Sequence, residues 1–242
     1  TAYSVAAPLS SNNDQALDFL STYGYLPERS SNEMVSLEDA IRDFQSRFEL
    51  PPSGKLDDAT MKLMGSDRCG VADKRNRRRS KRSLHSAWKQ GVVSYGLSWP
   101  PPDGVDFEHI RKQVRAAFDS WQAFANGNIR FEEKKKGNVD IAISFVSSAE
   151  HNAACSLPFG KNTLAHAFFP DDTPNGLIHV DTNRDWKNPQ LLLNLLVHEI
   201  GHTLGVMHDE KKSNNIMYPY LSSDDGEKVF SRQSIADFQS AY

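Results

Sequence analysis

Residues 198–208 read His-Glu-Ile-Gly-His-Thr-Leu-Gly-Val-Met-His, and this stretch decides how the rest of the chain is interpreted. Two histidines four residues apart lie on one face of a helix, so His198 and His202 can bind the same metal ion. Glu199 follows the first of them, where its carboxylate can hold an attacking water. The sequence therefore predicts a helix that carries both metal ligands and a general base.

A glycine and a third histidine extend this pattern. Gly205 can adopt the positive φ that ends a helix and turns the chain, which brings His208 to the third ligand position. Three imidazoles and one open position are typical of a catalytic zinc site, because a structural site fills all four positions. The alternative is a helix with surface histidines, and the extended spacing argues against it.

A methionine follows the motif. Met217 lies nine residues past His208, within the sequence Ser-Asn-Asn-Ile-Met-Tyr-Pro. The motif and this methionine together resemble the metzincin metallopeptidases, in which a Met-turn forms a hydrophobic floor beneath the metal. The resemblance implies that role for Met217, although an ordinary core methionine fits the same position.

Residues 1–82 are predicted to form three short helices. Apolar residues recur at helical spacing from Gln15 to Tyr25, and Ser36 and Asp57 are suited to cap the starts of a second and a third helix. The stretch Glu49 to Met64 resembles both the peptidoglycan-binding module and the propeptide of matrix metalloproteinases. A small three-helix adaptor is the alternative.

Residues 67–73, Asp-Arg-Cys-Gly-Val-Ala-Asp, resemble the cysteine switch of matrix metalloproteinases. A thiolate is a good zinc ligand, so Cys69 can occupy the fourth position of the catalytic zinc and exclude water. The resemblance implies a latent zymogen in which Arg68 and Asp73 form an ion pair that holds the switch loop. A buried structural thiol is the alternative for Cys69.

The run from Lys74 to Arg82 contains seven basic residues among nine. A solvated linker, a heparin patch and a nuclear signal are alternatives for such a run. Its last four residues, Arg-Ser-Lys-Arg, form the kind of site that secretory proprotein convertases cut, which makes a convertase an expected partner. Cleavage after Arg82 would release the segment that carries Cys69, and the site favours a secreted, extracellular protein.

Residues 83–242 are predicted to form five strands and three helices. The expected strands are 91–99, 129–135, 139–146, 164–169 and 176–182, and the expected helices are 107–124, 189–204 and 231–242. This order resembles the matrix metalloproteinase catalytic domain. The resemblance implies an α+β fold, in which a small three-helix propeptide domain precedes a metzincin catalytic domain with a five-stranded twisted mixed sheet and three helices.

Three further histidines have the spacing of a second metal site. His151, His166 and His179 match the family's ligands of a structural zinc, which the resemblance implies as a second cofactor. The family's aspartate ligand is replaced by Ala153. Water, Cys155 or another nearby side chain can complete the four ligands, and ordinary sheet histidines are the alternative.

The resemblance also suggests calcium as a cofactor, because family members bind calcium through acidic residues near the structural zinc. Asp140 and Asp181 match such residues. Pro158, Leu177 and Arg184 stand where the family has acids. We therefore expect at least one of the family's calcium sites to be lost.

Composition limits the classes of function. The chain has 242 residues, 38% of them hydrophobic, with a net charge of −3 and two cysteines. It is long enough for one ordinary domain and a small one, has too few cysteines for a disulfide scaffold, and has no apolar run of transmembrane length. We expect no nucleic-acid partner and a monomer.

These observations predict a secreted zinc endopeptidase that is held latent by Cys69 and activated by cleavage after Arg82. The expected substrates are extended segments of extracellular-matrix or other extracellular proteins, and tissue-inhibitor-type proteins are expected inhibitors. An adamalysin- or astacin-like metzincin, a non-catalytic wall- or matrix-binding protein and a basic-patch nucleic-acid binder are the competing hypotheses. Glu199 argues against the binding protein, because a protein without catalysis has no need of the base.

Overall fold

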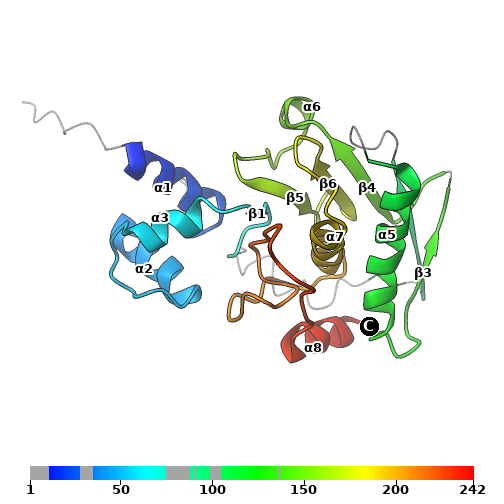
Figure 1. The fold of residues 1–242 in the computed structure, drawn as a ribbon. Coiled ribbons are helices and arrows are strands. Elements are labelled where there is room, and N and C mark those ends of the chain that lie inside the picture. The colour runs from blue at the N-terminus through cyan, green and yellow to red at the C-terminus, as the bar shows by residue number, and fades with distance from the viewer. Residues whose placement is uncertain (1–10, 28–34, 75–87, 90, 99–104, 136) are drawn as a thin grey trace, which may run out of the picture. The chain divides into compact units, whose positions relative to one another are not determined.

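The computed structural model describes residues 11–27, 35–74, 88–89, 91–98, 105–135 and 137–242. The chain divides into two compact units. The smaller unit is Thr1–Ser66 with Ala72–Lys74, and the larger is Asp67–Val71 with Arg75–Tyr242. Figure 1 shows helices alone in the first unit and a sheet with helices in the second.

The smaller unit contains the three expected helices, α1 (Ser11–Thr22), α2 (Leu37–Arg47) and α3 (Asp58–Met64). Both predicted caps are present. The side-chain oxygen of Ser36 accepts the Asp39 N–H at 3.1 Å, and the Asp57 carboxylate accepts the Thr60 N–H at 2.9 Å. Each cap satisfies an amide that the first helical turn leaves unpaired.

A buried glutamine organises the middle of this unit. Gln45 is fully buried, and its side-chain amide donates to Ser53 Oγ, the Lys55 carbonyl and Thr60 Oγ1 at 2.9–3.0 Å. Its carbonyl oxygen accepts the Gly54 N–H at 2.8 Å. The side chain therefore has partners at both ends and fastens α2 to the turn that precedes α3.

The larger unit is built on a mixed sheet with the strand order β1-β5-β6-β4-β2-β3. Its strands are β1 (Arg68–Cys69), β2 (Val92–Leu97), β3 (Arg130–Glu133), β4 (Ile141–Val146), β5 (Thr163–Ala167) and β6 (Leu177–Asp181). Among the paired strands of the described residues, β5 and β6 are antiparallel and the other pairs are parallel. The five predicted strands are confirmed. The two-residue strand β1 was not predicted, because so short a segment shows no alternation of apolar and polar residues.

Two long helices, α5 (Phe107–Gln122) and α7 (Pro189–Thr203), pack against each other and against the sheet. Trp121 of α5 is fully buried and donates its indole N–H to the Val197 carbonyl of α7 at 2.8 Å. The last helix is α8 (Arg232–Ala241), and Phe238 joins the same core. The three predicted helices are thus confirmed.

One short helix was not predicted. It is α6 (Ser148–Ala154), which follows β4 directly. The side-chain oxygen of Ser147 caps it by accepting the Glu150 N–H at 3.3 Å. Seven residues without an apolar stripe give no periodic signal, so only the cap could have indicated this helix. It carries His151 in its last turn.

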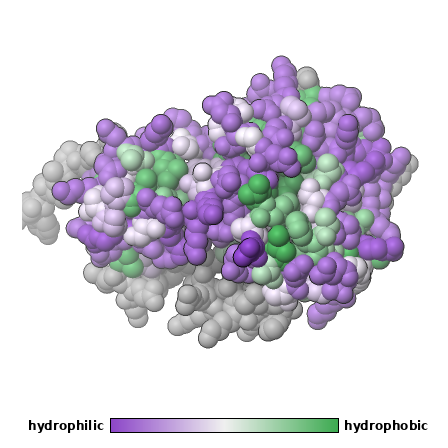
Figure 2. Space-filling model, turned by 60° about the horizontal axis from the view of Figure 1, so that its bottom comes forward, coloured by the Kyte–Doolittle hydropathy of each residue, from purple (hydrophilic) through white to green (hydrophobic). Residues whose placement is uncertain are grey.

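Among the described residues, few large apolar side chains are exposed. Figure 2 shows one face of the molecule, where apolar residues of the larger unit gather between hydrophilic ones. Within the described residues, no helix combines the length and apolar character needed to cross a membrane.

Candidate metal centres

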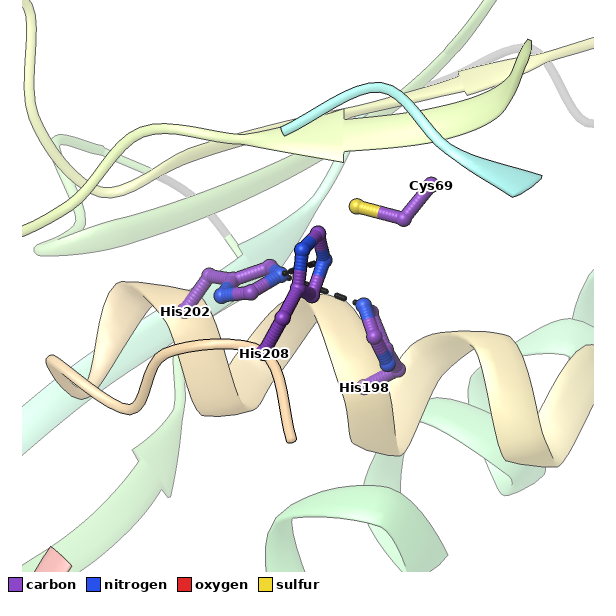
Figure 3. A group of neighbouring side chains, drawn as sticks. All are labelled: Cys69, His198, His202 and His208. Atoms are coloured by element: carbon purple, nitrogen blue, oxygen red, sulfur yellow. Dashed lines mark hydrogen bonds between the residues drawn. The ribbon is translucent and has the colours of Figure 1, made fainter. Parts of the chain in front are cut away.

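The helix α7 and the turn that follows it bring three histidines together. Gly205 has φ = +92°, the left-handed conformation that glycine adopts without steric cost. The turn places His202 Nε2 at 3.1 Å from both His198 Nε2 and His208 Nε2. Figure 3 shows His198 and His202 projecting from α7 and His208 reaching them from the segment beyond.

The protonation of these rings shows that the site fits a metal ion. His198 Nδ1 lies 2.7 Å from the Ile216 carbonyl, and His202 Nδ1 lies 2.8 Å from the Val206 carbonyl. A carbonyl oxygen only accepts, so both Nδ1 atoms carry protons. Burial and then the charge of His208 hold the pKa of His198 well below its usual value, so this ring is neutral. The Nε2 atoms of His198 and His202 lie 3.1 Å apart on the sides of the rings away from these carbonyls, an arrangement that a cation such as zinc would stabilise.

Glu199 lies beside these histidines, and its carboxyl group is buried and has a raised pKa. The residue is fully buried, and among the described residues no polar atom meets hydrogen-bond geometry with its side-chain oxygens, although the Cys69 thiol lies close enough to affect the pKa of the carboxyl group. Burial raises the pKa of Glu199 to about 8, against a smaller opposing effect of the Cys69 thiol. A buried carboxylate without partners costs free energy, and such groups occur mainly where a ligand or a reaction uses them. A water molecule at the metal would supply the missing partner.

Cys69 lies in β1 and faces the three histidines. Figure 3 shows its sulfur directed toward their rings. Its Sγ and the three ring nitrogens all lie within 4.8 Å of one another. The Val71 N–H donates to the sulfur at 3.3 Å. Burial and then the charge of Glu199 raise the pKa of the thiol well above its usual value, and coordination to a metal would reverse this effect by deprotonating the thiol.

The segment that carries Cys69 is held along both of its edges. On one side, Arg68 N–H donates to the Asn162 carbonyl at 2.9 Å and Gly70 N–H donates to the Ala165 carbonyl at 2.8 Å. On the other side, Cys69 N–H donates to the Pro219 carbonyl at 2.8 Å and Leu221 N–H donates to the Asp67 carbonyl at 3.1 Å. Residues 67–70 therefore lie between the edge of β5 and residues 219–221.

A buried methionine packs against the helix that carries His198 and His202. Met217 is fully buried, and the position of a Cβ on Gly201 would lie 2.8 Å from Met217 Sδ and 2.7 Å from Trp121 Cζ2. Only a residue without a side chain lets α7 approach the methionine and the tryptophan this closely. Met217 therefore packs against α7 between His198 and His202, and its role as the floor of the metal site stays a prediction.

We expect Gly201→Ala to destabilise the larger unit. Helix propensity favours alanine by about 1 kcal/mol, but overpacking against Trp121 and Met217 costs about 1–3 kcal/mol. Urea denaturation should therefore show a net loss of up to about 2 kcal/mol. Gly226→Ala is the matched control, because nothing lies within 4 Å of the Cβ position there. Equal stabilities for the two variants would contradict the proposed close packing.

A second cluster lies on the other side of β5. His151 comes from α6, His166 from β5 and His179 from β6, and their ring nitrogens lie 3.0–3.1 Å from one another. Cys155 Sγ lies 3.8 Å from His166 Nε2. Burial and then the neighbouring His179 and His151 lower the pKa of His166 to about 3, and burial and then His151 lower the pKa of His179 to about 4. Neutral rings at this spacing suit a metal ion.

Arg184 occupies the region where the family has a calcium ligand. Its guanidinium donates to the Lys161 carbonyl at 2.6 Å and to the Thr163 carbonyl at 3.3 Å. It also pairs with Asp67 at 3.2 Å and lies 3.6 Å from Asp181. Calcium is bound by carbonyl and carboxylate oxygens. The guanidinium of Arg184 contacts oxygens of these two kinds, so its positive charge takes the place that a calcium ion would have.

We expect Arg184→Gln to lower the stability of the uncut chain. Hydrogen bonds to a charged group contribute about 1.5–3 kcal/mol each, and glutamine can replace only part of them, so we expect a loss of about 2 kcal/mol. The loss should be the same with calcium and with a calcium chelator. Arg130→Gln is the control, because Arg130 and its partner Glu132 are 66% and 58% exposed. A stability restored by calcium would contradict this role of Arg184.

Asp209 is a residue whose position the sequence did not explain. It follows His208 in the chain, and its carboxylate accepts the Asn215 side-chain amide at 2.6 Å and Ser231 Oγ at 2.8 Å. Its N–H donates to the Met217 carbonyl at 2.9 Å. Asp209 therefore ties the third histidine to the methionine turn and to the start of α8, contacts between residues that are distant in sequence.

Two predicted features of the switch region stay predictions. Arg68 donates to the Cys69 carbonyl at 3.0 Å and to Tyr220 Oη at 3.3 Å, whereas Asp73 accepts from Tyr25 Oη at 2.8 Å. The ion pair between Arg68 and Asp73 is not tested by these contacts. The cleavage site after Arg82 lies outside the described residues.

Two histidines one helical turn apart, a third histidine after a left-handed glycine and a buried methionine against the same helix match the arrangement of the metzincin metallopeptidases. Comparison with known proteins agrees with this class. The model of the matrixin family matches residues 87–242, and that of the putative peptidoglycan binding domain matches residues 15–64. The chain belongs to the matrixin family.

Several relatives match both units. Matrix metalloproteinase-19 of Homo sapiens is 33% identical over 213 residues, which cover 84% of this chain and 40% of that protein. Matrix metalloproteinase-20 of Homo sapiens is 32% identical over 199 residues, with coverage of 81% and 39%. Matrix metalloproteinase-A of Caenorhabditis elegans is 28% identical over 218 residues, with coverage of 84% and 40%. The chain thus spans about two fifths of the length of these relatives.

Proposed function

We propose that this chain is a latent zinc metalloendopeptidase. The observation that carries the proposal is the buried carboxyl group of Glu199, which lies next to three convergent imidazoles and the Cys69 thiol. This carboxyl group interacts with the thiol, and no polar atom among the described residues meets hydrogen-bond geometry with its oxygens. In this proposal His198, His202 and His208 hold the catalytic zinc. Membership of the matrixin family supports the assignment.

The residues of the site have distinct roles in peptide hydrolysis. Zinc, when bound, supplies a Lewis acid that activates water and polarises the scissile carbonyl. A carboxylate oxygen of Glu199 takes the proton of the attacking water and later delivers it to the nitrogen of the leaving amine. Met217 forms the hydrophobic floor of the site, against which the imidazoles pack. The backbone carbonyls of Ile216 and Val206 orient two of the rings through their Nδ1 protons.

The substrate is an extended protein segment that adds to the edge of β5. The contacts of residues 67–70 support this, because they show which backbone groups a strand in this position meets. Those groups are on residues 162–165 on one side and residues 219–221 on the other. Strand addition uses main-chain hydrogen bonds, so it accepts many sequences and leaves selection to the side-chain pockets.

The enzyme is latent because residues 67–70 occupy the position at the edge of β5 where a substrate would bind. Residues 1–82 form the propeptide and residues 83–242 the catalytic domain. Cys69 supplies the fourth ligand and thereby excludes water, while Arg68 and Asp73 stabilise the switch loop as an ion pair. A proprotein convertase cuts after Arg82 in the secretory pathway, and the secreted enzyme then acts on matrix or other extracellular proteins and is open to tissue-inhibitor-type proteins.

A second zinc, held by His151, His166 and His179, has a structural role. The three ligands come from α6, β5 and β6, so the ion fastens the connection after β4 to the middle of the sheet. This site lies apart from Glu199 and takes no part in the hydrolysis.

The proposal is tested by cleavage of a quenched generic peptide before and after a convertase cut at Arg82, with a zinc chelator as control. We expect hydrolysis only after the cut and its loss with the chelator. Activity in the uncut chain would contradict the latency. Absence of activity from the cut chain with zinc bound would contradict the peptidase assignment and favour a binding protein.

A further inference from the structure

The second histidine cluster cannot satisfy itself by hydrogen bonds. His151 Nδ1 faces the side-chain oxygen of Asn152 at 3.2 Å, and that oxygen also accepts the Phe159 N–H at 2.6 Å. The Nδ1 of His151 therefore donates to this oxygen, which leaves its Nε2 to face the other two rings. Three ring nitrogens that all lie 3.0–3.1 Å from one another cannot each find a partner of the opposite kind. A cation at their centre resolves this conflict.

A closed site needs a fourth ligand, and the family's aspartate is absent. Ala153 stands at that position and is exposed. Two residues further, Cys155 ends α6 and donates its backbone N–H to the His151 carbonyl at 2.8 Å. Helical geometry thereby turns Cys155 toward the same side as His151, one turn away. Its Sγ lies 3.8 Å from His166 Nε2.

We infer that Cys155 is the fourth protein ligand of the second metal ion, so that three imidazoles and one thiolate enclose it. The inference rests on the structural zinc site proposed above and adds a ligand to it. All four ligand atoms lie within 4.8 Å of one another. Tetrahedral zinc with Zn–N near 2.0–2.1 Å and Zn–S near 2.3 Å places two nitrogens about 3.3 Å apart and a nitrogen and a sulfur about 3.6 Å apart. The observed distances are close to both values.

No other side chain competes for the fourth position in the part of the chain that the structure describes. The group of possible ligands around His151, His166 and His179 contains Cys155 and no carboxylate. A thiolate makes the site softer than one completed by a carboxylate, so it selects zinc over calcium or magnesium. With four protein ligands the ion has no open position, as in a structural site rather than a second catalytic one.

Cobalt spectroscopy tests this ligand in the full chain. The chain has two cysteines, so Cys69→Ser leaves Cys155 as the one thiol able to bind a metal. We expect the Cys69→Ser protein, loaded with cobalt(II), to bind two equivalents and to show a sulfur-to-cobalt charge-transfer band in the near ultraviolet. The band should be lost in Cys69→Ser/Cys155→Ala and in Cys69→Ser/Cys155→Asp, with aspartate retaining the second equivalent.

Metal competition gives a second readout. Loss of groups that only support a ligand weakens metal binding about 10–100-fold, so we expect Cys155→Ala to give up its second zinc to a chelator at least that much more readily. If the double variants do not fold, the labelling rate of Cys155 by a thiol reagent in Cys69→Ser answers the same question. Labelling should be slow with zinc bound and fast after zinc removal.

The outcomes separate this inference from the function proposed above. Two equivalents of cobalt without a sulfur band would overturn the role of Cys155 and leave the histidine site intact. One equivalent in Cys69→Ser would overturn the second metal site and the ligand together. A sulfur band in a protein that hydrolyses no peptide after the cut would uphold Cys155 and overturn the peptidase proposal alone.

Discussion

Glu199→Gln is expected to abolish peptide hydrolysis by the cut chain while both metal ions stay bound. General acid–base catalysis contributes about 10²–10⁴-fold, so kcat/KM should fall by roughly a thousandfold. Glutamine has nearly the same shape, and it removes a buried carboxylate whose oxygens have no partner. The melting temperature should therefore stay equal or rise, since a buried carboxyl group with few hydrogen bonds costs free energy.

Measurements of activity, stability and metal content together distinguish a loss of catalysis from a loss of folding. Activity is measured with the quenched peptide, stability by thermal unfolding and metal content by elemental analysis. Glu132→Gln is the matched control, since the Glu132 side chain is 58% exposed. A Glu199→Gln enzyme with near-normal kcat/KM would show that another group accepts the proton. A protein that loses its metal would show that Glu199 has a structural role instead.

Cys69→Ser is expected to make the uncut chain active. The hydroxyl of serine is a poor zinc ligand at neutral pH, whereas a thiolate is a good one. Loss of groups that merely support a ligand weakens metal binding about 10–100-fold, so loss of the ligand itself should raise the activity of the uncut chain at least tenfold. Peptide hydrolysis before any convertase treatment measures this directly.

Cleavage supplies the control for this variant. After the cut at Arg82 and removal of residues 1–82, the wild-type and Cys69→Ser enzymes have the same sequence and must have the same activity. An uncut Cys69→Ser chain as inactive as the wild type would show that the strand pairing of β1 blocks the site without help from the sulfur.

Much of the fold could be predicted from local sequence. The helices α5 and α7 and the five longer strands have clear periodicity, and Ser36 and Asp57 marked helix starts that the structure confirms. The strand β1 could not be predicted because its two residues are extended through hydrogen bonds to Asn162, Ala165 and Pro219. These partners lie about a hundred residues away or more, beyond the reach of any local pattern.

The candidate sites also contain features that local sequence predicts and features that depend on distant contacts. Spacing alone grouped His198, His202 and His208, because a helix and one turn fix their geometry. Spacing left the fourth ligand of the second cluster open among water, Cys155 and other side chains. The choice depends on α6, whose last turn directs the thiol toward His166, and this short helix has no periodic signal. The contacts of Arg184 and Asp209 depend likewise on distant residues.

The pairing of residues 67–70 with residues 162–165 and residues 219–221 has a consequence for activation. Before cleavage this segment is tethered, and a short tether corresponds to an effective concentration of about a millimolar. After the cut at Arg82 the same contacts join two separate molecules, whose association follows the concentration of the sample. A cut preparation should therefore gain activity on dilution, because dilution separates the released segment from the enzyme.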